Sequence, residues 1–315
     1  MDQPLTKSKL PPTIHPVGRT DQGKRLDQFL KEKIPSLSRT RIQQIIRQRV
    51  SLSWGADARP SSTVHAGGEV HIFYRELNET PLEIEIPIVA RGPGWICIDK
   101  PPKIPVHPVA KAFENTVIRM LRRQEGDDEL RLTHRLDAET TGALIVAEDN
   151  PTARHLSRSF FHDKVNKEYV ALVHGRVAED EGEIDLPIGQ PPDSRVWVRL
   201  AAGAEYDKPS LTRWLVERRF AETTLLRLFP KSGRRHQLRV HLESIGHPIV
   251  ADPLYGQPDS HYLAMVEGND PRRERPGPQR MLLHCAKMSF PDPTGDGLCE
   301  VEAPLPEDFT CHLKD

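Results

Sequence analysis

The segment "LTHRLDAETTGALIVA", residues 132–147, holds the residues of this sequence that are best suited to chemistry. Asp137 follows a His-Arg pair, and Thr140, Thr141 and Gly142 separate it from an apolar run. An aspartate in a turn most often acts as a turn former. A turn at the mouth of a buried strand is also where a rigid support displays catalytic side chains. We therefore treat Asp137 as a candidate catalytic carboxylate.

A second charged segment, "SGRRHQLRVH" at 232–241, is rich in cations: Arg234, Arg235, His236, Arg239 and His241. Like charges at such spacing repel one another unless anions answer them. An RNA backbone and one carboxylate would answer them, whereas the simpler alternative is a solvated basic helix face. The spacing of Leu238, Leu242 and Ile245 predicts that this helix packs on the core. Part of the basic set should therefore lie near packed structure.

Tyr169 is the third candidate. It stands in "KEYVALVHG", residues 167–175, where alternate residues are apolar as in a strand. The usual interpretation is a core tyrosine with a satisfied hydroxyl group. The functional interpretation is an aromatic ring on which a flipped nucleobase stacks.

Residue spacing argues against several other kinds of site. The four cysteines form no C-x-x-C pair, so neither a zinc site nor a disulfide framework is indicated. His236 and His241 are five residues apart, which is not the spacing of a helical zinc pair. A glycoside hydrolase needs two carboxylates flanking the bond, and Glu139, two positions from Asp137, does not establish such a pair. We expect no metal and a reducing, cytoplasmic environment.

Membrane association is not expected. No apolar run reaches the roughly 20 residues of a membrane span, and the first residues lack the apolar centre of a secretory signal. From residue 89 onward, β-like runs such as "WICIDK", "ALIVA" and "TTLLRLFP" alternate with helical patterns, one of them opening with Asn150 as N-cap and Pro151 at N1. This pattern predicts an α+β fold with a mixed sheet. The polar segment 267–280 predicts a mobile surface loop.

The beginning of the chain is basic. Residues 1–75 hold 13 Lys and Arg and 6 Asp and Glu, hence +7, although the whole chain carries −1. This asymmetry suggests a separate module that meets a polyanion. Two amphipathic helices are predicted, the second with Ser38 as N-cap, and their apolar positions are Leu26, Phe29, Leu30 and Ile34, then Ile42, Ile45, Ile46 and Val50.

Two helices followed by a small sheet resemble the small RNA-binding domain named after ribosomal small-subunit protein four. The matching segments are "RLDQFL" at 25–30, "SRTRIQQIIRQRVSL" at 38–52 and "AGGEVHIF" at 66–73. The resemblance implies that the second helix docks RNA through Arg39, Arg41 and Arg47. We expect an unstructured lead-in over 1–15, this domain over 16–80, a linker over 81–88 and a catalytic domain over 89–315.

The remaining motifs resemble the large-ribosomal-subunit, or Rlu, type of RNA pseudouridine synthase, in the RluA family. "HRLDAETTGALIVA" is similar to its signature, and further blocks follow in order: "KPPKIPVHP", "KEYVALVHG", "SGRRHQLRVHLESIGHPIVADPLYG", "RMLLHCAKMSF" and "APLPEDF". Lys103 and Ala251 stand where glycine is common in the family. The resemblance implies a mixed, largely antiparallel sheet with flanking helices.

The resemblance also implies roles for individual residues. Asp137 looks like the catalytic aspartate, Tyr169 like the ring that stacks on uracil, and Arg239 like the partner of the aspartate. Arg135 is expected to help hold the flipped nucleotide, with Leu238 packed beside the site. Three further residues are expected to bind substrate: His134, Arg234 and His236.

The implied reaction is the isomerisation of uridine to pseudouridine in structured RNA, which requires no cofactor. The expected substrate is large-subunit ribosomal RNA, with transfer RNA as an alternative, and the expected state is a monomer. Two other hypotheses stay open: a catalytically silent RNA-binding or ribosome-assembly protein, and a hydrolase that acts on a free nucleoside.

Overall fold

The computed structural model describes residues 12–34, 39–73, 79–109, 112–194, 196–274 and 276–313. The chain divides into two compact units, Met1–Asn78 and Glu79–Asp315. The predicted N-cap Ser38 and the side chain of Arg41 lie outside the described part of the chain.

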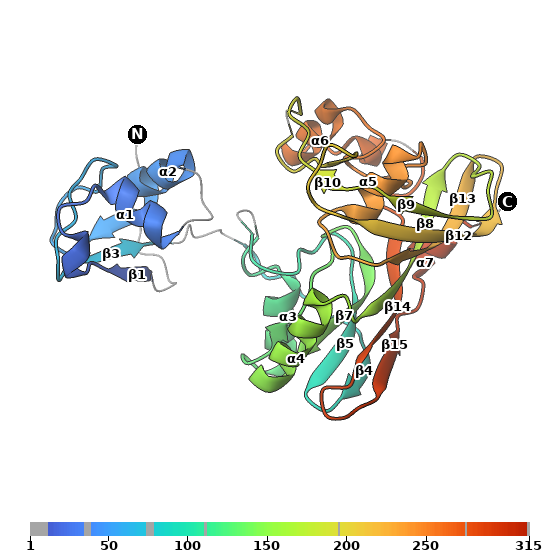
Figure 1. The fold of residues 1–315 in the computed structure, drawn as a ribbon, viewed down its shortest axis with the longest axis horizontal. Coiled ribbons are helices and arrows are strands. Elements are labelled where there is room, and N and C mark those ends of the chain that lie inside the picture. Colours follow the sequence, from blue (N-terminus) through green and yellow to red (C-terminus); the bar gives the residue numbers. More distant parts are fainter. Residues whose placement is uncertain are drawn as a thin grey trace. The chain divides into compact units, whose positions relative to one another are not determined.

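The first unit combines two helices with a small antiparallel sheet of strand order β1-β3-β2 (Figure 1). The two predicted amphipathic helices are confirmed, because Leu26, Phe29 and Leu30 of the first and Ile42 and Ile46 of the second are buried in one core. The elements are β1 (Thr13–Pro16), η1 (Arg19–Asp21), α1 (Leu26–Lys33), α2 (Arg39–Arg49), β2 (Val50–Leu52) and β3 (Glu69–Ile72).

The prediction of an unstructured lead-in over 1–15 is wrong for its last residues. Thr13–Pro16 form strand β1, which pairs with β3 from Thr13 opposite Ile72 to Pro16 opposite Glu69. Residues 1–11 lie outside the described part of the chain. The segment reads as irregular in sequence because its strand is short and contains proline, which sheets tolerate at an edge.

The second unit is built on a ten-stranded sheet. Eight of its strands follow the order β4-β5-β7-β14-β8-β13-β12-β9, and the other two, β15 and β6, pair with β14 and β7. Among the described strands of this sheet only β7 and β14 pair in parallel, so the predicted α+β fold with a mixed, largely antiparallel sheet is confirmed. The strands are β4 (Ile88–Gly92), β5 (Trp95–Lys100), β6 (Arg131–Leu132), β7 (Thr141–Ala147), β8 (Asn166–His174), β9 (Glu181–Asp185), β12 (Leu211–Arg219), β13 (Thr223–Pro230), β14 (Leu283–Pro291) and β15 (Leu298–Glu302).

The helices of this unit lie in separate places along the sheet. Figure 1 shows α3 and α4 beside β5 and β7, and they contribute Val117, Leu121 and Leu156 to the main core. Helix α5 contributes Leu238 and Leu242 to that core. The remaining bounds are α3 (Val117–Glu125), α4 (Asn150–Phe161), β10 (Ile188–Gly189), β11 (Ala201–Ala202), α5 (Gln237–Ser244), α6 (Asp259–Val266), η2 (Pro271–Glu274) and α7 (Glu307–Thr310).

Three local predictions need correction. Asp149, and not Asn150, caps α4, because its carboxylate accepts a hydrogen bond from the Thr152 amide at 2.7 Å. Ile245, expected to point inward, follows the end of α5 and is 37% exposed. The segment 267–280 was predicted as a mobile loop, yet it contains η2, whose Arg272 is buried and forms an ion pair with Glu139.

No helix within the described residues is long and apolar enough to cross a membrane.

The parallel contact of β7 with β14 yields a prediction at Gly142. Its φ is +102°, and a Cβ there would lie 2.2 Å from the carbonyl oxygen of Cys285. Gly142→Ala should therefore lower the free energy of unfolding by on the order of 3 kcal/mol, measured by urea denaturation. Gly126→Ala is the matched control: φ is +67° but no atom lies within 4 Å, so about 1 kcal/mol is expected. Equal losses would contradict the steric argument.

Candidate active site

Asp137 sits on a turn between β6 and β7. The turn is closed by the Thr140 amide, which donates to the Asp137 carbonyl oxygen at 3.1 Å. Every residue of β7, from Thr141 onward, is buried, and Leu136 is buried as well. The carboxylate therefore projects from a short turn whose two ends are held in the core, which fixes its position.

Lys100, the last residue of β5, supports this turn through hydrogen bonds to its backbone. Its ammonium group is fully buried and donates to the carbonyl oxygens of Pro101, Ala138 and Thr140 at 2.7, 2.8 and 3.0 Å. Burial lowers the pKa of Lys100 to about 7, although the Asp137 and Glu139 carboxylates favour its charged form. The three acceptors match the three N–H bonds of an ammonium group, so this contact favours the protonated lysine.

Arg239 of α5, about a hundred residues further along the chain, contacts the same turn. Its Nη1 donates to Oδ2 of Asp137 at 2.9 Å, while Nε and Nη2 donate to Oδ2 and Oδ1 of Asp252 at 2.6 and 2.8 Å. Asp252 is itself held by the amides of Leu254 and Tyr255. The Tyr255 ring lies 4.9 Å from the guanidinium carbon. The guanidinium thus bridges two carboxylates from separate segments with fixed geometry.

These charges determine the protonation state of Asp137. Burial alone would raise the pKa of its carboxyl group, but His236 and Arg239 lower it, and the net shift is downward. Burial also lowers the pKa of His236 to about 4, so this imidazole is neutral at pH 7. At neutral pH the cations that favour the ionised form of Asp137 are therefore Arg239, which also donates a hydrogen bond to it, and Arg135. Although burial opposes it, Asp252 and Asp137 raise the pKa of Arg239, which stays charged.

The structure gathers all the predicted site residues of the second unit around one pocket of about 500 Å³. They lie on four separate segments of the chain: the turn before β7, strand β8, the loop after β13 and helix α5. The residues are His134, Arg135, Asp137, Tyr169, Arg234, His236, Leu238 and Arg239.

Tyr169 and Leu238 form an apolar wall of this pocket. Tyr169 lies on β8 opposite Cys285 and Leu228, and its side chain is 9% exposed. Burial raises the pKa of its hydroxyl group, which is therefore neutral. Leu238 is buried on the first turn of α5. A flat ring and an aliphatic side chain beside a carboxylate suit a planar, uncharged base.

The imidazole of His134 is held by contacts within the protein. Its Nε2 accepts from the Ile145 amide at 2.9 Å, and its ring stacks on Phe160 with centroids 4.2 Å apart. Burial lowers the pKa of His134 to about 3, so it is neutral. These contacts tie α4 to the turn that carries Asp137.

The other predicted residues border the opening. Arg135 and Arg234 are exposed. His236 lies deeper, with Nδ1 hydrogen bonded to the Tyr255 hydroxyl at 2.9 Å and Nε2 3.9 Å from Oδ2 of Asp137. His236 also has φ +58°, which turns the chain into α5. Exposed cations therefore lie at the opening, whereas Arg239 is buried beside Asp137.

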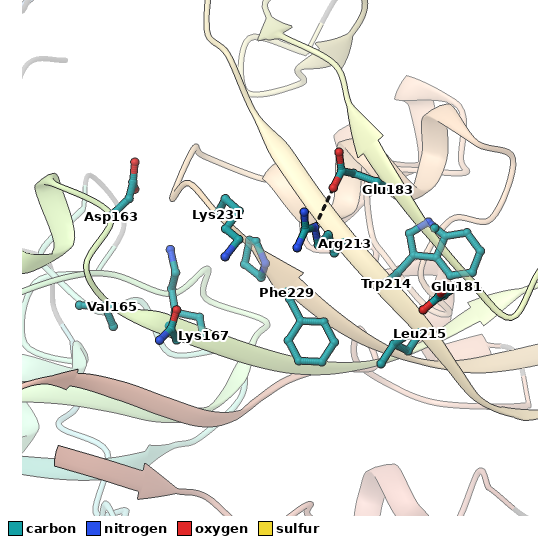
Figure 2. A pocket seen from close by; sticks show the side chains of 13 residues that line it. Asp163, Val165, Lys167, Glu181, Glu183, Arg213, Trp214, Leu215, Phe229 and Lys231 are labelled. Carbon is teal, nitrogen blue, oxygen red and sulfur yellow. Dashed lines mark hydrogen bonds and ion pairs between the residues drawn. The ribbon is translucent and has the colours of Figure 1, made fainter. Parts of the chain in front are cut away.

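A second pocket of about 730 Å³ shares Asp163, Lys167 and Pro230 with the first, so the two lie side by side. Figure 2 shows Lys167 and Lys231 at one end, and Phe229 and Leu215 further along. The lining contains three cations and three carboxylates: Lys167, Arg213, Lys231, Asp163, Glu181 and Glu183. Arg213 is paired with Glu183 at 2.7 Å. This second pocket is therefore close to electrically balanced.

Sequence reasoning missed a second ion pair beside the site. The Arg272 guanidinium donates two hydrogen bonds to the Glu139 carboxylate, at 2.9 and 3.0 Å. It also donates to Asp270 at 2.8 Å. The Met281 amide donates to Glu139 at 3.2 Å. These contacts hold the Asp137 turn to a segment far along the chain, so Glu139 supports the turn and is not free to act beside Asp137.

Some of the missed residues carried a signal. Lys100 stands at the end of the apolar run "WICIDK", where a buried lysine needs several acceptors. Asp252 lies in "VADPLYG", one of the blocks that carry the family resemblance. Lys103 and Ala251, where the family commonly has glycine, have φ of +63° and +58°. Glycine adopts this left-handed conformation without strain, which explains its usual place there.

Within the described residues, no three or more His, Cys, Asp or Glu side chains gather as a metal site would require.

This chain is similar in sequence to a family of known proteins. The model of the RNA pseudouridylate synthase family matches residues 94–244. The chain is 32% identical over 302 residues to ribosomal large subunit pseudouridine synthase D of Nitrosomonas europaea, covering 93% of this chain and 84% of that one. It is also 32% identical over 308 residues to the Escherichia coli protein of the same name, covering 93% and 90%.

A solved structure agrees with these relatives. Human RNA pseudouridylate synthase domain containing 1 superposes with a TM-score of 0.58 at 29% identity, over 72% of this chain and 86% of that chain. The chain therefore belongs to the family of RNA pseudouridine synthases, which are isomerases. Its identity to the synthase D relatives extends over most of its length.

The Lys100 contacts generate a prediction about the reaction. Lys100→Met leaves three carbonyl oxygens without their donor, so the Asp137 turn should shift. We expect kcat to fall by about 100-fold, because small displacements of a catalytic group have such effects, while KM changes little. Steady-state kinetics on RNA measure this split. Lys103→Met is the control, since Lys103 is exposed in the next turn; an equal loss there would refute a specific role for Lys100.

Proposed function

We propose that this chain converts uridine to pseudouridine in large-subunit ribosomal RNA, with Asp137 as its catalytic residue. The observation that carries the proposal is the ionised Asp137 carboxylate, held by Arg239 at 2.9 Å on the floor of a pocket walled by Tyr169 and Leu238. The substrate class follows from the two relatives, both of which are named as ribosomal large subunit pseudouridine synthases.

The reaction moves one bond of the base and changes no oxidation state. The bond from the sugar to N1 of uracil breaks, the base turns, and a bond from the sugar to C5 forms; C5 loses a proton and N1 gains one. Arg239 contacts Oδ2 of Asp137, and among the described residues no hydrogen bond is made to Oδ1. Oδ1 is thus the oxygen available to attack the anomeric carbon or to remove a sugar proton. Either route balances without a cofactor.

A uridine inside a helix cannot reach this pocket and must be flipped out, at roughly a few kcal/mol. The ring of Tyr169 offers a stacking surface, worth on the order of 1–3 kcal/mol for a base. Arg135 and Arg234, exposed at the opening, are placed to meet the phosphates on either side. Arg239 positions Asp137 and takes no part in the bond exchange.

The first unit fits a second contact with RNA, as a domain similar to that of ribosomal small-subunit protein four. Its two helices and small three-stranded sheet support this proposal. Arg47 is exposed on α2, and Arg39 is exposed although it also lies 3.4 Å from the buried Asp27. Residues 1–75 carry a net +7, which favours a polyanion over a neutral partner.

Release of tritium from C5 of uridine tests the proposed reaction directly. In vitro transcribed large-subunit ribosomal RNA, labelled at C5, is incubated with the wild type, Asp137→Asn and Glu139→Gln. We expect release by the wild type, a loss of at least about 1,000-fold in Asp137→Asn, and a much smaller loss in Glu139→Gln. Glu139 is the matched control because it is a neighbouring carboxylate that is also paired with a buried arginine. Release by Asp137→Asn at the wild-type rate would reject the assignment.

The lowered pKa of Asp137 predicts the pH dependence of the same reaction. The carboxylate is active when ionised, so activity is present above its lowered pKa and is lost only as the pH falls through it, below the usual value of about 3.9. Arg239→Met removes the cation that opposes burial, so the acidic limb of kcat/KM should move to higher pH. Arg239→Lys retains a cation and should move it less. A limb at the same pH in all three proteins would contradict this account.

The proposed RNA contact of α2 is tested through salt dependence. Each phosphate contact adds about 0.9 to the slope of log K against log salt. The double variant Arg39→Gln/Arg47→Gln should therefore weaken RNA binding and lower the slope by 1–2, about one unit per lost contact. Lys24→Gln is the control, because the Lys24 ammonium group already forms ion pairs with Asp21 and Glu32, at 2.8 and 2.6 Å. An unchanged slope in the double variant would remove α2 from the RNA contact.

A further inference from the structure

Phe161, the last residue of α4, is an aromatic side chain on the rim of the catalytic pocket. It is 81% exposed, the highest value for any large apolar side chain among the described residues. Trp197 is the next most exposed aromatic, at 75%, but it does not line the pocket. Phe161 therefore combines an unusual exposure with a position beside the proposed reaction.

The helix end that carries Phe161 is anchored by its neighbours. Phe160 stacks on His134, which is hydrogen bonded to β7, so the end of α4 is tied to the segment that carries Asp137. The chain then leaves the helix sharply, with Asp163 at φ +53°. His162 meets the Phe161 ring edge-on, with centroids 5.1 Å apart. An exposed ring on an anchored helix end is thus presented at the opening of the pocket.

Flipping of the target uridine creates a need for such a ring. The pocket of about 500 Å³ receives the flipped base, and the bases on either side lose a stacking neighbour. Aromatic side chains accept unstacked bases regardless of sequence, because every base has a π-face. The adjoining second pocket is less suited to guide the strand, since its three cations face three carboxylates.

We propose that Phe161 is a stacking subsite for the RNA base adjacent to the flipped uridine. This inference rests on the proposed function, because it takes the occupant of the pocket to be a uridine of RNA. Arg135 lines the same opening and is exposed, so a phosphate between the two bases has a cation within the same rim. Phe161 contributes to binding the substrate and takes no part in the bond exchange.

Steady-state kinetics on the full chain test the subsite, with C5-labelled large-subunit ribosomal RNA transcripts as substrate. Phe161→Ala should raise KM by about 5- to 100-fold with kcat nearly unchanged, as loss of one base stack predicts. Phe161→Tyr retains the ring and should stay near the wild type. Trp197→Ala removes an equally exposed aromatic outside the pocket and should have no effect. Thermal unfolding should be the same for all variants.

The outcomes separate this inference from the proposed function. If the wild type releases no tritium, the proposed function itself fails. If the wild type is active and Phe161→Ala has the same KM, only the stacking subsite is overturned. An equal rise of KM in Trp197→Ala and Phe161→Ala would also overturn it, since it would indicate a general effect of surface aromatics.

A direct reading of the stack uses Phe161→Trp in the Asp137→Asn background, so that no turnover occurs. Addition of the same RNA should quench the fluorescence of the added tryptophan, in excess of any change seen in Asp137→Asn alone. A base stacked on the indole gives this result. Tight RNA binding without additional quenching would show that the ring faces solvent or another macromolecule, and would overturn the subsite.

Discussion

The bridge that Arg239 makes between Asp137 and Asp252 is the interaction on which the rest of the site depends. A buried guanidinium requires anions, and here both come from segments other than its own helix. Asp252 holds the arginine with two hydrogen bonds and is itself fixed by two backbone amides. The third hydrogen bond helps to hold the pKa of Asp137 below its usual value, although burial by itself raises that pKa. One side chain thus sets the position and the charge of the proposed catalytic group.

The turn that carries Asp137 is supported on every side by such contacts. Lys100 holds its backbone from β5, and Arg272 holds Glu139 from the segment after α6. His134 links it to α4 through Phe160. The side chains at the opening differ, because Arg135, Arg234 and Phe161 are exposed. A rigid floor suits the proposed reaction, which needs precise placement of a carboxylate, and an exposed rim suits an RNA substrate whose target base must first be flipped out.

Much of this could be predicted from the sequence because it is local. The helices of the first unit follow from the periodicity of Leu26, Phe29 and Leu30, which is a property of neighbouring residues. The candidate residues on three separate motifs were identified by their types and by a family resemblance, and all of them border one pocket. The boundaries were weaker: the strand at Thr13–Pro16 depends on pairing with β3, which no local pattern reports. Arg272 in an apparently loose loop is another such case, since its partner Glu139 lies far away in the chain.

The sequence by itself therefore determined the class of fold, the approximate order of elements and the identity of the chemical groups, because these are recorded in residue type and short-range spacing. Only the tertiary structure decided which groups meet. The mixed sheet brings the turn before β7 and helix α5 together, so that Asp137 and Arg239 lie 2.9 Å apart although they are distant in sequence. It also decided that Lys100 is buried under the turn while Phe161 stays exposed at its rim. Burial and ionisation depend on all neighbours in space, and the linear order of residues does not contain those distances.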